Sequence, residues 1–287
     1  MHLYKWLLSA VILSATACNR SAPVSFNRHI ALEGEPNFRD LGAYQTTGDQ
    51  AVRPGILYRS GSLHNLTAAD QEHLTELGIK TVVSFLTESE RADHGNDKLP
   101  TDIKRVFLPI EGLGSEVDDL ILARKTGDFS KIPVDFNYNI HKILPETGKD
   151  AYAALFNLLA DESNYPIVFH CSHGVHRTGT ASALILSALG VPWDTIRNDY
   201  MLSRTYRHDQ NTRRADQLEQ IAKANPDITD QAANKAYIDA FFFLQPEYID
   251  GTQSHILSTY GSYESYLSAA GVQPEELAAV KRILLTD

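Results

Sequence analysis

The sequence predicts an α/β protein in which helices flank a central, mostly parallel sheet, followed by an α-helical C-terminal third. Segments with strand and helix patterns alternate along the first 190 residues, as they do in parallel sheets with helical crossovers. From residue 193 onward the patterns are helical. The chain has 287 residues, enough for a large core. No linker divides residues 35–287, so we expect one domain there.

Four short apolar segments are predicted to be strands. Residues 79–86 are β-branched and apolar, which indicates a strand that is buried on both faces. The first segment ends in a turn of Gly and Ser. The four segments are residues 56–63 (ILYRSGSL), 79–86 (IKTVVSFL), 106–110 (VFLPI) and 165–170 (YPIVFH).

Helices are expected between these strands and after them. Thr67 can cap a helix over residues 66–78. Residues 151–161 carry apolar side chains at positions i, i+3, i+4 and i+7, the pattern of an amphipathic helix. Residues 178–190 are predicted to form a third helix because Gly190 follows its apolar run.

Two other segments have a less regular pattern. Residues 111–135 are rich in Gly and Asp, and a stretch of that length is often a lid or a binding insertion. Pro274, followed by two glutamates, marks the start of the last helix.

The charge of the chain limits its function. The net charge is −10, the pI is about 5.5, and no run of basic residues is present. This composition argues against a nucleic-acid partner. An anionic substrate would have to bind at a focused local site rather than on a basic face.

The N-terminus has the pattern of an export signal. Residues 1–17 contain a lysine, a short apolar run and the small residues Ala15-Thr16-Ala17. The run is shorter than the ~20 residues that span a bilayer. Cys18 resembles the lipidated cysteine of a bacterial lipobox, although Ala15 stands where Leu is usual. Plain secretion and an uncleaved anchor are the alternatives.

Lipidation of Cys18, plain secretion and an uncleaved anchor would each mean that the protein is exported. We therefore expect a bacterial cell-envelope protein whose membrane contact is a lipid on Cys18, or a periplasmic or secreted one. Residues 18–34 would form a tether. If Cys18 is lipidated, the mature chain keeps one thiol, Cys171, and cannot form an internal disulfide. A single thiol in an exported protein is a candidate for chemistry.

Residues 170–179, HCSHGVHRTG, combine a predicted strand end, a loop with Gly174 and a predicted helix start. In this arrangement the N–H groups of the loop and the helix N-terminus converge on an anion. Arg177 can hold two phosphate oxygens in a bidentate contact. The predicted phosphate-binding residues are Ser172, His173, Gly174, Val175, His176 and Arg177.

The same stretch predicts a nucleophile. Loop amides, the helix dipole and Arg177 would all favour the thiolate of Cys171. That thiolate can attack phosphorus and form a phosphocysteine, which water then hydrolyses. Thr178 can donate a hydrogen bond to the sulfur and help it leave. His170 is expected to orient the loop rather than to titrate in the reaction.

Two other interpretations use the same residues. Cys171, His173 and His176 could be zinc ligands, but Arg177 would place a fixed positive charge beside the metal. The chain offers no second Cys/His cluster for a fourth ligand. The other alternative is a buried cysteine among surface histidines. We expect the phosphate loop, with no metal and no cofactor.

The motif HC, five residues and RTG resembles the signature of the cysteine-dependent protein tyrosine and dual-specificity phosphatases. Rhodanese-like sulfurtransferases fit less well. The further motifs make the chain similar to bacterial NFRDLG-type tyrosine phosphatases over about residues 35–286. In order, they are NFRDLGAY, RPGILYRSGSL, LGIKTVV, the loop itself, DYMLS and YGSYESYL.

This resemblance implies a phosphotyrosine-phosphatase-like fold and a phosphorylated protein as substrate, with phosphotyrosine foremost and phosphoserine or phosphothreonine as further targets. Relatives often have Asp-Leu-Arg where this chain has Ser84-Phe85-Leu86. They often have Lys-Asp where it has Val175-His176. The lysine is associated with phosphoinositide activity, so Val175 makes that alternative weaker. A catalytically silent phosphate-binding module is a further alternative.

The general acid is less defined by the sequence. In the phosphatase family that the chain resembles, the general acid lies on a separate loop and gives a proton to the leaving oxygen. Glu111, directly after the VFLPI segment, is the first candidate, and His176 is the second. Asp118 and Asp119 lie in the suspected lid. Arg39 and Asp40 of the NFRDLG motif are expected near the site in a structural or a functional role.

Overall fold

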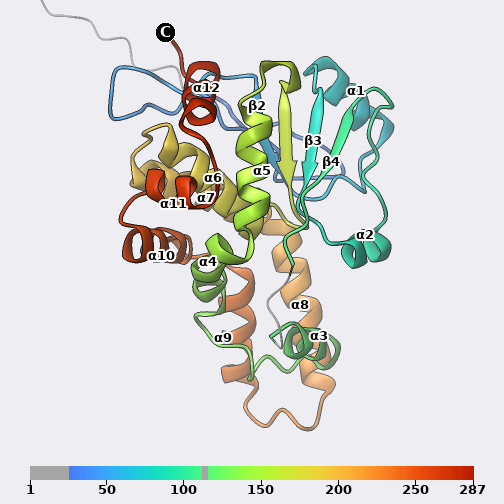
Figure 1. Ribbon diagram of the computed structural model, residues 1–287. Helices are drawn as coiled ribbons and strands as arrows, with labels where there is room; N and C mark the ends of the chain where they lie inside the picture. Colours follow the sequence, from blue (N-terminus) through green and yellow to red (C-terminus); the bar gives the residue numbers. More distant parts are fainter. Residues whose placement is uncertain (1–25, 112–115) are drawn as a thin grey trace, which may run out of the picture.

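The computed structural model describes residues 26–111 and 116–287 (Figure 1). The predicted signal peptide, Cys18 and the first part of the predicted tether lie outside the described residues. Among the described helices, none combines the length and the apolar character needed to cross a membrane.

The centre of the fold is a five-stranded sheet with the order β1-β2-β5-β3-β4. Strand β5 pairs in parallel with β2 on one side and with β3 on the other, and β4 extends the parallel part. Only β1 is antiparallel. The predicted fold class, a mostly parallel sheet flanked by helices, is confirmed. The strands are β1 (Arg39–Asp40), β2 (Leu57–Ser60), β3 (Thr81–Ser84), β4 (Lys104–Phe107) and β5 (Ile167–His170).

Strand β4 begins and ends earlier than the predicted strand at residues 106–110. It occupies Lys104–Phe107, and the amide of Lys104 already donates to the carbonyl of Lys80. Pro109 has no N–H group to donate to the ladder, so the strand ends before it. The amide of Ile110 still donates to the carbonyl of Phe85, which keeps this segment beside the end of β3.

Twelve α-helices are described, and the three that the sequence predicted most clearly are present within two residues of their expected starts. They are α1 (Ala68–Glu76), α2 (Glu88–His94), α3 (Glu116–Thr126), α4 (Phe136–Thr147), α5 (Lys149–Leu159), α6 (His176–Ala188), α7 (Trp193–Tyr206), α8 (His208–Ala224), α9 (Gln231–Phe242), α10 (Asp250–Tyr260), α11 (Tyr263–Ala269) and α12 (Pro274–Leu284). The predicted cap at Thr67 forms a capping box with Asp70.

Alternation along the strands divides the core into two layers. Val82 and Val168 pack with the α1 residue Leu74 on one face of the sheet. Val83 and Phe169 pack on the other face, in a larger cluster that contains the apolar side chains of α5 and α6. The sheet is therefore covered on both faces, as its parallel pairing requires.

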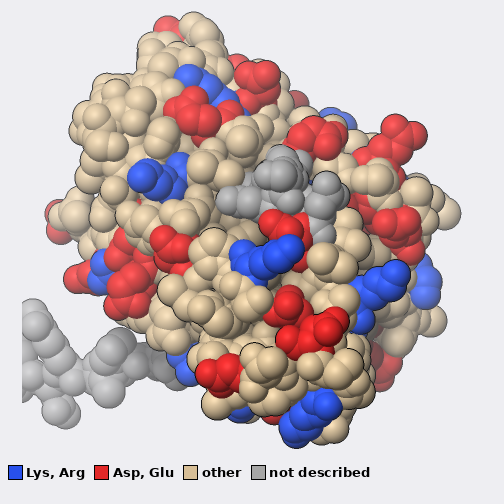
Figure 2. Space-filling model, turned by 90° about the horizontal axis from the view of Figure 1, so that it is seen from below, with Lys and Arg blue, Asp and Glu red and all other residues tan. Residues whose placement is uncertain are grey.

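The carboxyl ends of the parallel strands share one edge. In Figure 1 the arrowheads of β3 and β5 point toward the part of the molecule that holds α4 and α8. In this architecture ligands bind at that edge. Figure 2 views the molecule from this side and shows acidic and basic side chains interspersed, without a continuous basic surface on the described residues of that face.

Part of the expected tether is packed against the domain. Ile30 donates its amide to the carbonyl of Phe38, and His29 forms a bridge with Arg39. The amides of Glu33 and Gly34 donate to the carboxylate of Asp70. These backbone groups between residues 29 and 34 therefore find partners in the described fold.

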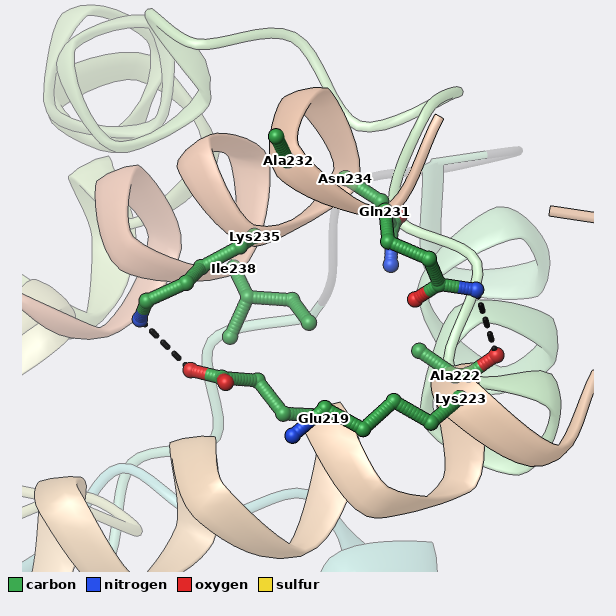
Figure 3. A pocket seen from close by; sticks show the side chains of 8 residues that line it. All are labelled: Glu219, Ala222, Lys223, Gln231, Ala232, Asn234, Lys235 and Ile238. Atoms are coloured by element: carbon green, nitrogen blue, oxygen red, sulfur yellow. Dashed lines mark hydrogen bonds and ion pairs between the residues drawn. The ribbon is translucent and has the colours of Figure 1, made fainter. Parts of the chain in front are cut away.

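A cavity of about 190 Å³ lies between α8 and α9 (Figure 3). Lys235 pairs with Glu219 across it, and Gln231 donates to the carbonyl of Ala222. All of its lining residues lie between 219 and 238. None of them comes from the HCSHGVHRTG loop, so this cavity is not the predicted phosphate site.

Candidate active site

The loop of residues 171–175 connects the central strand β5 to helix α6. Cys171 follows β5 directly and is 3% exposed. Helix α6 begins at His176, two residues before the predicted start, so Arg177 lies in its first turn. Cysteine, loop and helix N-terminus therefore lie together at the carboxyl edge of the sheet, the arrangement suited to an anion.

Gly174 is required by the path of this loop. Its φ is +67°, and a Cβ atom there would lie 2.5 Å from the carbonyl oxygen of Ser60. A side chain at this position would meet both backbone strain and the end of β2. The loop consequently packs directly on β2.

The carbonyl groups of the loop are held by two side chains from outside it. The Nδ2 atom of Asn37 donates to the carbonyls of His173 and Gly174 at 3.0 and 3.3 Å. Arg59 Nη2 donates to the Gly174 carbonyl at 2.8 Å. Holding the carbonyls in this way favours loop amides that face the opposite side, and the His173 amide is among the groups that lower the pKa of the Cys171 thiol.

Beneath the loop lies a buried group of charges. Asp199 accepts from Arg39 Nε at 3.0 Å and from Arg59 Nη1 at 2.6 Å, and all three side chains are at most 1% exposed. Tyr44 donates to the same carboxylate. Two arginines share one aspartate, so a positive charge remains close to the loop. Burial, and then Arg39, lower the pKa of Arg59 to about 10.

The NFRDLG motif is therefore structural in most of its contacts. Arg39 reaches Asp199 and Ser203 in the DYMLS segment of α7. Asp40 accepts from the amides of Gly42 and Gly55 at 2.6 Å each. Asn37 is the residue of this motif that touches the loop.

Arg177 is fixed by Glu90, a residue that the sequence analysis did not select. The Glu90 oxygens lie 2.6 Å from Nη1 and 2.5 Å from Nη2 of Arg177. The carbonyl of Phe85 accepts from Nη1 at 3.0 Å, and Ser172 Oγ lies 3.2 Å from Nη2. Burial opposes the charge of Glu90, but the hydrogen bonds and the charge of Arg177 lower the pKa of this carboxyl to about 2.

Glu90 also had a readable signal in the sequence. Residues 87–90, TESE, have the S/T-x-x-E pattern of a capping box, and Thr87 and Glu90 form that box at the start of α2. Because the box follows β3 directly, it places Glu90 at the carboxyl edge of the sheet.

The contacts of Arg177 leave one side of its guanidinium available. Among the described residues, no hydrogen-bond partner contacts Nε, and Nη2 donates to Ser172 Oγ at 3.2 Å besides its pairing with Glu90. These two nitrogens form the edge that can bind two oxygens of a phosphate.

The environment of Cys171 favours a thiolate. Burial opposes the charge, but Arg177, the hydroxyl and amide of Thr178 and the amide of His173 outweigh it and lower the pKa of the thiol. The buried Thr178 hydroxyl has no hydrogen-bond partner among the described residues. The contact between Thr178 and the Cys171 sulfur stays a prediction.

His170 is completely buried between two acceptors. Its Nε2 atom lies 2.9 Å from Asp97 Oδ2, and its Nδ1 atom lies 3.3 Å from the carbonyl oxygen of Cys171. Asp97 also accepts the amide of Leu63 at 3.0 Å. Asp97 was not selected from the sequence, because it lies 73 positions from His170 in a stretch without a distinctive pattern.

The three histidines in and beside the loop have different surroundings. His176 Nε2 lies 2.8 Å from Asn137 Oδ1, whereas His170 faces Asp97 and His173 is exposed. Within the described residues, no group of three or more His, Cys, Asp or Glu side chains has an arrangement that could hold a metal ion. The zinc alternative therefore finds no support in this geometry.

Among the candidates for the general acid whose side chains are described, none has a hydrogen bond to Arg177 or Glu90. Glu111 is exposed and follows Ile110, whose carbonyl oxygen lies 3.4 Å from Arg177 Nη1. Asp119 in α3 is exposed, and the side chain of Asp118 lies outside the described residues. Burial, and then Arg177, lower the pKa of His176 to about 4, so at neutral pH this ring has no proton to donate as an imidazolium.

Comparisons with known proteins agree on one family. The model of the tyrosine phosphatase family matches residues 30–286. A Cupriavidus necator protein, provisionally named a tyrosine-protein phosphatase, is 30% identical over 272 residues, which cover 93% of this chain and 94% of that protein. The triple specificity protein phosphatase PtpB of Mycobacterium tuberculosis is 28% identical over 278 residues, covering 88% and 98% of the two chains.

Solved structures are matched more weakly. TpbA of P. aeruginosa aligns with a TM-score of 0.30 and 17% identity over 68% of this chain and 96% of TpbA. The catalytic core of the S. cerevisiae phosphatase Siw14 aligns with a TM-score of 0.31 and 16% identity, over 82% and 96% of the two chains.

Proposed function

The chain belongs to the tyrosine phosphatase family, and we propose that it hydrolyses phosphotyrosine in proteins through a phosphocysteine at Cys171. The observation that carries this proposal is the convergence of the buried Cys171 and Arg177 at the N-terminus of α6, where the pKa of the thiol is lowered. The family makes the protein a phosphatase, and phosphorylated molecules its substrates. The roles of single residues are part of the proposal.

In the first step, the thiolate of Cys171 attacks phosphorus. An S–P bond forms, the bond between phosphorus and the ester oxygen breaks, and that oxygen leaves with a proton from the general acid. In the second step, water attacks phosphorus. The S–P bond breaks, inorganic phosphate leaves, and the thiolate is restored. A hydrogen bond from the Thr178 hydroxyl would stabilise the departing sulfur in this second step.

The transition state of each step carries negative charge on three phosphate oxygens. The amides of residues 172–176 and the free edge of Arg177 would bind these oxygens. Their positions are supported by the contacts of Asn37 and Arg59 with the loop carbonyls and by the pairing of Glu90 with Arg177. These groups are fixed before the substrate binds, so little reorganisation is needed.

Glu111 is the proposed general acid. Its support is its place directly after Ile110, whose carbonyl contacts Arg177, and its exposure, which lets it reach a bound ester. His176 is a weaker candidate because its lowered pKa leaves it neutral. Glu111 must be tested against Asp119, which is also exposed.

The substrate class is proposed as phosphotyrosine, with phosphoserine and phosphothreonine as further substrates. Val175 and His176 occupy the positions at which NFRDLG-type relatives often carry Lys and Asp, and Val175 is buried in the core. It offers no charge to a second phosphate group. Phosphoinositides or inositol phosphates are the alternative substrates, and a silent phosphate-binding module is the third possibility.

We also propose that the protein acts in the bacterial cell envelope, with residues 1–17 removed and Cys18 lipidated. The support is the sequence pattern alone, an apolar run followed by Ala15-Thr16-Ala17-Cys18. Labelling with palmitate and globomycin-sensitive processing would support this proposal. Export without label would point to a periplasmic or secreted protein instead. Residues 35–287 are proposed as one phosphatase domain.

The proposed activity is tested by a substrate panel. Purified protein is assayed on p-nitrophenyl phosphate, phosphopeptides and phosphoinositides, in the presence and in the absence of EDTA. We expect turnover of p-nitrophenyl phosphate and of phosphotyrosine peptides, no effect of EDTA, and inactivation by iodoacetate. Faster turnover of phosphoinositides would favour the alternative substrate class. No turnover of any substrate would indicate a binding module.

A further inference from the structure

The strand residue before the cysteine is part of a buried chain of three groups, Asp97, His170 and the backbone of Cys171. The ring of His170 is 0% exposed and the side chain of Asp97 is 9% exposed. The two contacts of the ring are Nε2 to Asp97 Oδ2 at 2.9 Å and Nδ1 to the Cys171 carbonyl oxygen at 3.3 Å. These two contacts connect the carboxylate of Asp97, through His170, to Cys171, the residue proposed as the nucleophile.

The two contacts of the ring bear on its protonation. A carboxylate oxygen and a carbonyl oxygen only accept hydrogen bonds, whereas a neutral imidazole has a single N–H donor. Both contacts can be hydrogen bonds only if both ring nitrogens carry protons. An imidazolium at His170 would satisfy both contacts, and Asp97 would balance its charge. Consistent with this, burial favours the neutral ring, but Asp97 outweighs burial and raises the pKa of His170.

Asp97 is itself held in place. Its Oδ1 atom accepts the amide of Leu63 at 3.0 Å, and the amide of Lys98 donates to the Leu63 carbonyl. The neighbouring amide of Ser62 donates to the carbonyl of Ser172 in the loop. Residues 62–63 thus join the segment that carries Asp97 to the phosphate loop.

We propose that Asp97 is a positioning residue for dephosphorylation, which keeps His170 as an imidazolium beneath the Cys171 carbonyl and thereby stabilises the thiolate. This inference rests on the proposed function. The imidazolium supplies a positive charge beside the Cys171 backbone and donates to its carbonyl, which fixes the first peptide group of the loop.

Other charged groups also lie near Asp97, His170 and Cys171, and they stay unchanged when Asp97 is replaced. On either side of β5, the residues paired with His170 are the uncharged Ser60 and Ser84. The titratable or charged groups near His170 are Glu35 and His64, and His94 stacks on His64. Those near Cys171 are Arg177, Arg207 and Tyr152. A difference between Asp97 variants therefore reports on the Asp97 charge.

The test is the pH dependence of Cys171 alkylation by iodoacetate. In Asp97→Asn, the amide can donate to Nε2 and accept from Leu63, so both contacts persist while the charge is lost. We expect the pKa of inactivation to rise by about one unit or more. At a pH one unit below the wild-type value, the rate would then fall roughly tenfold. Asp97→Glu should stay closer to the wild type, and the exposed control Asp93→Asn should not change.

Two results would overturn the inference. The first is a folded Asp97→Asn variant, checked by thermal melting, with a wild-type alkylation profile. The second applies even if that variant does not fold: ¹⁵N NMR of the unaltered protein showing a singly protonated His170 ring at neutral pH. Turnover retained in Cys171→Ser would instead refute the cysteine mechanism itself, so the two failures are distinguishable.

Discussion

Glu90 binds both terminal nitrogens of Arg177, with distances of 2.6 Å from Oε2 to Nη1 and 2.5 Å from Oε1 to Nη2. The pairing leaves the edge formed by Nε and Nη2 for a phosphate. Glu90 is also the N3 residue of the capping box at the start of α2. One carboxylate therefore connects the start of a helix to the arginine that is proposed to bind the substrate.

Replacing Glu90 should impair catalysis without removing the nucleophile. In Glu90→Ala the guanidinium loses its fixed orientation, and a misplaced binding group of this kind costs about 100-fold in kcat/KM. Steady-state kinetics on a phosphotyrosine peptide measure the effect. Glu88→Ala, which removes an exposed glutamate from the same helix turn, is the matched control. Equal kinetics in both variants would show that Arg177 does not depend on Glu90.

Glu90 should also make stability depend on pH in acid. Its pKa falls from 4.5 to about 2 in the folded state, so below pH 4.5 the unfolded chain binds the proton more readily. The stabilisation is complete above about pH 4.5 and is lost as the pH falls toward 2. Urea unfolding across this window should show a smaller loss of stability in Glu90→Gln than in the wild type. Identical slopes would contradict the assigned shift.

Gly174 should be far less tolerant than a glycine of similar backbone conformation elsewhere. Gly78 has φ +66° and open space around it, whereas Gly174 has φ +67° and Ser60 directly beside it. Gly78→Ala should cost about 1 kcal/mol of unfolding free energy from strain alone and leave kcat/KM unchanged. Gly174→Ala should cost more and lower kcat/KM about 100-fold, because the loop amides move. Similar effects at both positions would mean that the contact with β2 is unimportant.

Glu111 should matter most for substrates whose leaving group needs a proton. Loss of a general acid costs about 100-fold or more, so Glu111→Gln should slow phenyl phosphate by that factor. It should affect p-nitrophenyl phosphate much less, since that leaving group departs without help. Asp119→Asn is the parallel variant in α3. If Asp119→Asn shows the selective loss and Glu111→Gln does not, the acid is assigned to the wrong loop.

The sequence was sufficient for those parts of the site that are local. Strand, glycine loop and helix N-terminus follow one another within residues 165–190, so their order alone places Cys171 beside Arg177. The helix cap at Thr67 was readable for the same reason. Helix α6 begins at His176 rather than at Thr178, because the first turn has polar residues that an apolar pattern does not include.

The supporting residues could not be read in the same way. Asn37 contacts His173 of the loop from 136 positions away, and Asp97 contacts His170 at the end of β5 from 73 positions away. Only the fold brings them together. Sequence spacing gives no measure of such contacts. Glu90 is the exception, since the capping-box pattern at residues 87–90 could have placed it at the carboxyl edge of β3.

The central claim, a phosphocysteine at Cys171, is tested most directly by trapping the intermediate. The protein is mixed with a ³²P-labelled phosphotyrosine peptide, denatured rapidly during turnover and digested, and the labelled fragment is sequenced. We expect label on Cys171 in the wild type, with neither label nor turnover in Cys171→Ser. Turnover that persists in Cys171→Ser, or label found on another residue, would contradict the mechanism.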